Sequence, residues 1–153
     1  MLNNKEYHAS IKETNGNLVI SNGLIERIFQ NGTTVRLNNL MTGEGMLRSV
    51  RPEAEIEINH IKIPVGGLTG QPVHNYLLPE WLDAMTPDSM AFQYDGYEVS
   101  DIQPRFAWKP RKEWMASNPA WPAKGKELIL KYKANRQLLH LSLIHISEPT
   151  RLA

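Results

Sequence analysis

The sequence contains no cysteine, which excludes disulfide bonds, thiolate metal sites and a cysteine nucleophile. It also lacks long apolar runs: nothing approaches the roughly 20 residues that a membrane-spanning helix needs, so no membrane partner is predicted. The N-terminal residues MLNNKEYHAS do not contain the apolar core of a signal peptide. Neither sign of charge dominates, because 17 Lys and Arg face 16 Asp and Glu. Such a balance provides no electrostatic footprint for nucleic acid.

What the chain does have is the composition of one globular domain. Its 153 residues are 41% hydrophobic and 22% charged, which is ordinary for a globular protein. After a loose polar lead-in over residues 1–16, short apolar runs alternate with Asn-Gly pairs. These pairs are strong hairpin signals, because both residues tolerate a positive φ. The pattern predicts a meander with strands at Asn17–Ser21, Leu24–Phe29 and Thr33–Leu37.

The residues from Glu53 to Val65 give the clearest hairpin prediction. Apolar and acidic residues alternate strictly over EAEIEI, Asn59-His60 makes the turn, and IKIPV returns. We expect Ala54, Ile56 and Ile58 to face inward and the glutamates at 53, 55 and 57 to face solvent. An acidic metal-binding face is the alternative, but period-2 spacing is more typical of a solvated strand face.

Other segments complete an all-β pattern. We predict a short strand at Met46–Val50, a turn of helix at Pro79–Met85, and strands at Phe92–Val99 and Lys126–Lys133, the first with a bulge at Gly96. The segment Gln103–Lys124 is rich in proline and tryptophan, and no helix fits it. The predicted fold class is an antiparallel β-sandwich with long loops rich in aromatic residues and proline.

The end of the chain is predicted to have a different origin. Residues 141–151 read LSLIHISEPTR, which resembles, residue for residue, the translation of a transposase-type sequencing-library adapter. Periodicity alone would favour a short strand followed by a Ser-Glu-Pro turn. We interpret residues 141–153 as a non-native tail and give them no functional weight. The native sequence is then expected at residues 17–140, as a truncated β-sandwich domain after its lead-in.

Candidate functional residues are aromatic and lie on two loops. The loop Val65–Asp83 carries His74, Tyr76 and Trp81, and the Pro-rich segment carries Trp108, Trp114 and Trp121. Flat aromatic faces suit stacking on sugars, so a glycan is a candidate partner. The alternative is that these rings fill a core under long loops or pack against a neighbouring domain. Outside a core role, the six residues are contact candidates for substrate or for another domain.

Catalytic patterns are weak. Glu80, Asp83 and Asp88 lie close in sequence, and a carboxylate pair would suit glycoside hydrolysis. Solvation, or a place for Glu80 in the first turn of a short helix, explains them more simply. The histidines have no metal-ligand spacing, and no nucleophile elbow or phosphate-binding loop is present. We therefore predict no catalytic residue, no metal site and no cofactor in this chain.

Several stretches together resemble a known family. They are ISNGLIERIF, NLMTGEGMLRSVRPEAEI, VGGLTGQP, NYLLPEWLD and the KEW…WP…KGKEL segment. They are similar to an N-terminal domain of large bacterial glycoside hydrolases, of the alpha-galactosidase (melibiase-like) type found in polysaccharide-degrading gut bacteria. The resemblance spans roughly residues 17–134. It implies a β-sandwich of the super-sandwich kind that packs against a (β/α)₈ catalytic barrel.

In such enzymes the catalytic aspartates lie in the barrel, so the resemblance assigns no catalytic residue here. It implies that the partner of this domain is a C-terminal catalytic domain of the same chain. The sequence does not fix the compartment, and a periplasmic or secreted parent is one candidate. We expect the loop around Tyr76 and Trp81 to face the barrel or to rim its substrate cleft. The alternatives are a stand-alone carbohydrate-binding module that stacks sugars on Trp108, Trp114 or Trp121, and a purely structural β-domain.

Overall fold

The computed structural model describes residues 7–72, 76–109, 111, 113, 121–122 and 124–134. In this part of the chain the named strands pair antiparallel, and one short 3-10 helix, η2, accompanies them. The prediction of an all-β antiparallel fold is confirmed. The elements are β1 Ser10–Thr14, β2 Asn17–Ser21, β3 Ile25–Gln30, β4 Thr33–Asn39, β5 Glu44–Gly45, β6 Ala54–Ile58, β7 Ile61–Val65, β8 Leu68–Thr69, η2 Pro79–Ala84, β9 Thr86–Pro87, β10 Gln93–Asp101 and β11 Lys126–Lys133.

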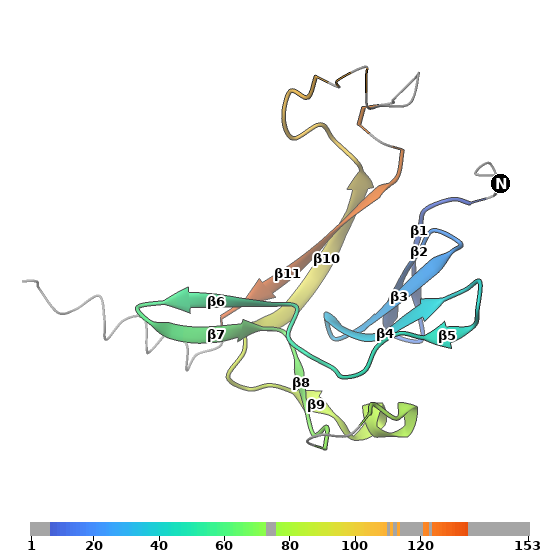
Figure 1. Ribbon diagram of the computed structural model, residues 1–153. Helices are drawn as coiled ribbons and strands as arrows, with labels where there is room; N and C mark the ends of the chain where they lie inside the picture. Colours follow the sequence, from blue (N-terminus) through green and yellow to red (C-terminus); the bar gives the residue numbers. More distant parts are fainter. Residues whose placement is uncertain are drawn as a thin grey trace, which may run out of the picture.

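The N-terminal part is a five-stranded meander in the order β1-β2-β3-β4-β5 (Figure 1). The turn between β3 and β4 is Asn31-Gly32, as predicted, with φ of 48° and 69°. Positive φ at both central residues matches the right-handed twist of a two-residue hairpin. The strand predicted at Leu24 begins one residue later. Leu24 instead lies in a turn, where its N–H donates to Asn22 Oδ1 at 2.9 Å.

The lead-in contains a strand that the sequence reasoning did not predict. Ser10–Thr14 is β1 and pairs with β2 through an Asn15-Gly16 turn, with φ of 52° and 74°. Residues 10–14 are therefore structured, and the expectation of a loose lead-in is wrong for them. The missed signal was Asn15-Gly16, an Asn-Gly pair of the same kind as Asn31-Gly32, which correctly located the turn between β3 and β4. A second correction concerns Met46–Val50, which is not a strand. In this segment of the chain the strand is Glu44–Gly45, which pairs with β4.

The predicted β6–β7 hairpin is confirmed, with Asn59 and His60 at φ of 51° and 63°. The predicted inward face is only partly buried. Ile63 is 8% exposed, whereas Ile56, its partner across the hairpin, is 43% exposed and Ile58 is 42% exposed. Figure 1 shows that the hairpin projects away from the meander, which accounts for the partial exposure of Ile56 and Ile58.

Glu53 does not face solvent, so the predicted solvent-facing glutamate side is wrong at this position. Its side chain is 15% exposed and connects the hairpin to the meander. One carboxylate oxygen accepts the Thr34 N–H at 2.6 Å, and the other pairs with Arg27 Nη2 at 2.5 Å. Glu55 and Glu57, which are 56% and 55% exposed, face solvent as predicted. Position 53 differs because it lies just before β6, in contact with β3 and β4.

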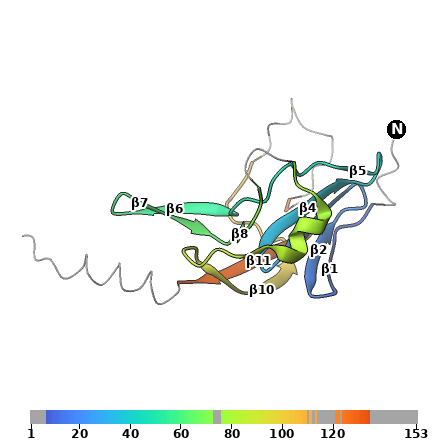
Figure 2. The same ribbon diagram turned by 90° about the horizontal axis from the view of Figure 1, so that it is seen from below.

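The β10–β11 ribbon runs beside the meander (Figures 1 and 2). The predicted bulge is present between Tyr94 and Gly96. Tyr132 Oη donates to the Gly32 carbonyl, and the Tyr94 ring lies over Gly32, where a Cβ would collide with it. The ribbon is thus fastened to the turn between β3 and β4.

The core lies between β4, η2 and the segments that flank them. Its central cluster is Val35, Val50, Leu82 and Met85, which are 3–7% exposed. Trp81, Leu77, Leu68 and Ile28 pack against this cluster. Thr33 is fully buried, and its hydroxyl accepts the Gly67 N–H at 2.7 Å. Buried contacts therefore hold much of the loop Val65–Asp83 against the meander.

Candidate functional site: the Arg48–Tyr76 groove

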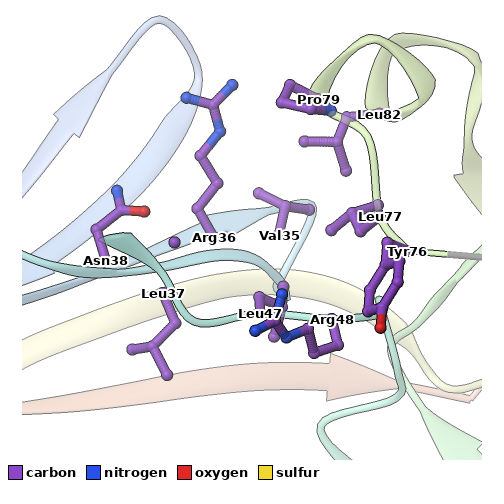
Figure 3. Close-up of a pocket in the computed structure, with 11 residues that line it drawn as sticks. Val35, Arg36, Leu37, Asn38, Leu47, Arg48, Tyr76, Leu77, Pro79 and Leu82 are labelled. Carbon is purple, nitrogen blue, oxygen red and sulfur yellow. The ribbon is translucent and has the colours of Figure 1, made fainter. Parts of the chain in front are cut away.

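A pocket of about 260 Å³ lies between β4, residues 45–48 and the segment from Tyr76 into η2 (Figure 3). Its apolar wall is formed by Val35, Leu77 and Leu82. The side chains of Arg36 and Arg48 also line it, and Tyr76 stands at its edge. We call this pocket and its edge the Arg48–Tyr76 groove.

Local contacts hold the two sides of the groove together. The Leu77 N–H donates to the Arg48 carbonyl at 3.1 Å. Pro79 then begins η2, where its fixed φ is favourable and its missing N–H costs nothing. On the other side, the Val50 N–H donates to Gln71 Oε1 at 2.9 Å. The groove is therefore formed by segments far apart in the sequence.

Tyr76 and Arg48 form the edge as a pair. The Arg48 guanidinium lies 5.5 Å from the centroid of the Tyr76 ring, within the range of a cation–π interaction. The ring is nevertheless 72% exposed. A second hollow, of about 700 Å³, shares Arg48 and Tyr76 and adds Arg51. The edge thus separates two hollows.

The electrostatics of the groove are positive. Arg36 and Arg48 form no ion pair among the residues that the structure describes, and no acidic residue lines either of the two hollows. Glu44 lines a further hollow beside Arg48, where its carboxylate accepts the Thr42 hydroxyl at 3.1 Å. Arginine presents a planar fork of donors that matches a carboxylate.

The predicted contact residues fall into separate places. Tyr76 lies at the edge of the groove, whereas Trp81 packs against the core cluster beneath it. The packing of Trp81 gives part of this loop a use inside the domain. His74 and Trp114 lie outside the described residues.

Trp108 and Trp121 belong to an aromatic cluster with Phe106. The Trp121 ring lies 5.1 Å from Trp108 and 5.2 Å from Phe106, centroid to centroid. Phe106 is 60% exposed and Trp121 is 44% exposed. This cluster belongs to the β10–β11 connection, at the end of the ribbon remote from η2 (Figure 1). The aromatic residues therefore do not form one continuous surface with Tyr76.

Arg36 and Arg48 were missed by the sequence reasoning. Arg36 was embedded in a predicted strand, and Arg48 in a segment read wrongly as one. The available signal was the run LRSVR at residues 47–51, which carries two arginines and no acid. Only the fold shows that this run meets Tyr76.

Features typical of catalysis are not seen in the described residues. No group of three or more His, Asp or Glu side chains is placed to hold a metal there. The shifted pKa values belong to Tyr94, Tyr97 and Tyr132, none of which lines the groove. Burial raises the pKa of Tyr132 to about 12. Among the described residues, no helix has the length and apolar character to cross a membrane.

The fold and the groove together define a class: an all-β domain with a positively charged, aromatic-edged hollow. No family model, curated protein or solved structure matches the chain.

Proposed function

We propose that this chain is part of an N-terminal, non-catalytic β-domain of a carbohydrate-active enzyme, an alpha-galactosidase-like glycoside hydrolase. Its role is to buttress the catalytic barrel or to rim the substrate cleft. The family resemblance of residues 17–134 supports the identity of the enzyme. The structural observation that carries the proposal is the uncovered apolar face of the β6–β7 hairpin.

That face has a regular composition. Ile56 pairs with Ile63, and Ile58 pairs with Ile61, so four isoleucines share one side of the hairpin. Ile63 is buried, but Ile56, Ile58 and Ile61 are 43%, 42% and 39% exposed. Contiguous exposed apolar surface of this kind marks a contact with another protein surface. The opposite side of the hairpin is polar and carries the Lys62–Glu55 ion pair at 3.0 Å. Only the isoleucine side therefore has the composition of a surface that another domain would bury.

The test compares one substitution in two contexts. Ile56→Ser is introduced into the 153-residue chain and into the full-length enzyme, with Lys62→Ser as the control on the polar side. In the chain alone, Ile56→Ser should change the free energy of unfolding by less than about 0.5 kcal/mol, as is usual for surface sites. In the enzyme, where the proposal buries this side chain, it should cost about 1–3 kcal/mol.

Lys62→Ser should have little effect in both contexts. Equal effects of Ile56→Ser in the chain and in the enzyme, measured by urea unfolding, would contradict a buttressing contact at this hairpin.

A second candidate function is sugar binding at the Phe106–Trp108–Trp121 cluster, favoured by the exposure of two of its rings. Stacking on aromatic faces would hold a neutral pyranose ring. Calorimetric titration of the chain with neutral oligosaccharides tests this, with Trp121→Ala as the variant. A titration without saturable heat excludes the candidate, as does binding that Trp121→Ala leaves unchanged.

A further inference from the structure

We infer that the Arg48–Tyr76 groove binds a uronic acid unit, that is, a sugar ring that carries a carboxylate. The inference deepens the proposed function, because it names the chemical class that a domain at the rim of a substrate cleft would contact. It rests on the charge of the groove, the exposed face of Tyr76 and the size of the pocket.

The charge of the groove selects an anion. Arg36 and Arg48 both line the pocket, and neither has an ionic partner among the described residues. The position of Arg48 over the Tyr76 ring reduces the conformational freedom that a long side chain would lose on binding. A guanidinium held in this way presents its N–H donors to a carboxylate in a fork geometry.

The aromatic edge selects a sugar rather than a simple anion. Arg48 occupies one side of the Tyr76 ring, and the ring remains 72% exposed. A free planar face suits the C–H side of a pyranose. An extended acidic peptide would need a row of cations along its path, whereas the pocket itself has two.

The size of the pocket limits the ligand. Its volume of about 260 Å³ lies below the roughly 300–1,000 Å³ typical of drug-sized ligand sites. One sugar unit is therefore the expected occupant. Further units of a chain can extend past Tyr76 into the neighbouring hollow of about 700 Å³, which Arg51 also lines.

The experiment titrates the 153-residue chain with three matched probes and follows backbone amide chemical shifts by NMR. Sodium galacturonate carries both ring and carboxylate, galactose carries the ring alone, and acetate carries the carboxylate alone. We expect galacturonate to shift amides of residues 36–48 and 76–82 and to bind about tenfold or more tightly than either other probe. It should bind more tightly than galactose because hydrogen bonds between charged groups are the strong ones, and more tightly than acetate because its ring adds the contact with Tyr76. Binding should weaken as salt is raised.

Three variants locate the site. Arg48→Gln should weaken galacturonate binding by about ten- to a hundredfold, and Tyr76→Ala should abolish the preference for galacturonate over acetate. Lys12→Gln, on β1 at the opposite edge of the same sheet, should change nothing. Arg48 and Tyr76 are both exposed, so the variants are expected to fold, and far-UV circular dichroism verifies this.

Other outcomes overturn the inference. Galactose binding as tightly as galacturonate would exclude a role for the carboxylate, and acetate binding equally would exclude a sugar site. Absence of saturable shifts, or an unchanged affinity in Arg48→Gln, would exclude the groove. None of these results bears on the hairpin contact tested by Ile56→Ser, so failure of this inference and failure of the proposed function are distinguishable.

Discussion

Substitution of Glu53 tests the connection between the β6–β7 hairpin and the meander. The structure gives this carboxylate two partners, the Thr34 N–H at 2.6 Å and Arg27 Nη2 at 2.5 Å. In Glu53→Ala both are lost. Thr34 is 8% exposed, and a buried N–H left without an acceptor costs about 1–3 kcal/mol. The Arg27 side chain is 45% exposed, so the ion pair adds only about 0–1 kcal/mol.

We therefore expect Glu53→Ala to lower the free energy of unfolding by about 1–4 kcal/mol. Glu53→Gln keeps an oxygen for the Thr34 N–H and removes only the charge, so its cost should be smaller, about 1 kcal/mol. The matched control is Glu57→Ala, on the strand β6 that follows Glu53, at a site 55% exposed. It should stay within about 0.5 kcal/mol of wild type.

Urea unfolding followed by circular dichroism measures all three variants, provided that the slope of the transition is unchanged. A Glu53→Ala effect equal to that of Glu57→Ala would refute the anchoring role. So would a Glu53→Gln variant as unstable as Glu53→Ala, because the oxygen that accepts from Thr34 would then contribute nothing.

Three further predictions concern the packing of the ribbon and the core. Gly32→Ala should cost at least about 2 kcal/mol, because its φ is +69° and a Cβ would collide with the Tyr94 ring. Gly43→Ala, at φ of +73° with open space around it, should cost about 1 kcal/mol in the same urea experiment. Trp81→Ala should destabilise the chain by about 2–4 kcal/mol, seen as a lower melting temperature, because this ring packs against the core cluster; an unchanged melting temperature would contradict that packing. Burial raises the pKa of Tyr132 to about 12 from 10.0. The contribution of this shift to the stability of the folded state is therefore complete below pH 10 and is lost as the pH rises through 12. After discounting for solvent screening the loss is about 1 kcal/mol, and Tyr132→Phe should remove this part of the pH dependence of urea unfolding.

The sequence predicted local structure well where turn chemistry determines it. The turns at Asn31-Gly32 and Asn59-His60 both adopt the positive φ values that their residues tolerate. The bounds of β2, β7 and β11 agree with the predicted strands. These features depend on residues adjacent in sequence, which is why periodicity and turn signals sufficed.

Burial was predicted less well, because it depends on what lies across from a strand. Alternation in β6 identified its apolar face, but it could not show that Ile56 and Ile58 stay partly exposed. Glu53 had the same local pattern as Glu57, and only its partners 19 and 26 residues away distinguish it.

The sequence predicted one of the two residues that form the edge of the candidate site. Tyr76 was named from its aromatic loop, since an exposed ring on an ordered loop is a recognisable signal. Arg48 was not named, because its importance comes from its position over the Tyr76 ring, across a long stretch of sequence.

The measurement that tests the proposed origin of this chain most directly is the sequence of the uninterrupted gene, read from genomic DNA past the codon for His140. We expect the reading frame to continue into further β-strands and then into the alternating β and α segments of a (β/α)₈ barrel, without the residues LSLIHISEPTR. A stop codon near that point, or a genomic sequence that encodes LSLIHISEPTR, would contradict the assignment to a larger glycoside hydrolase.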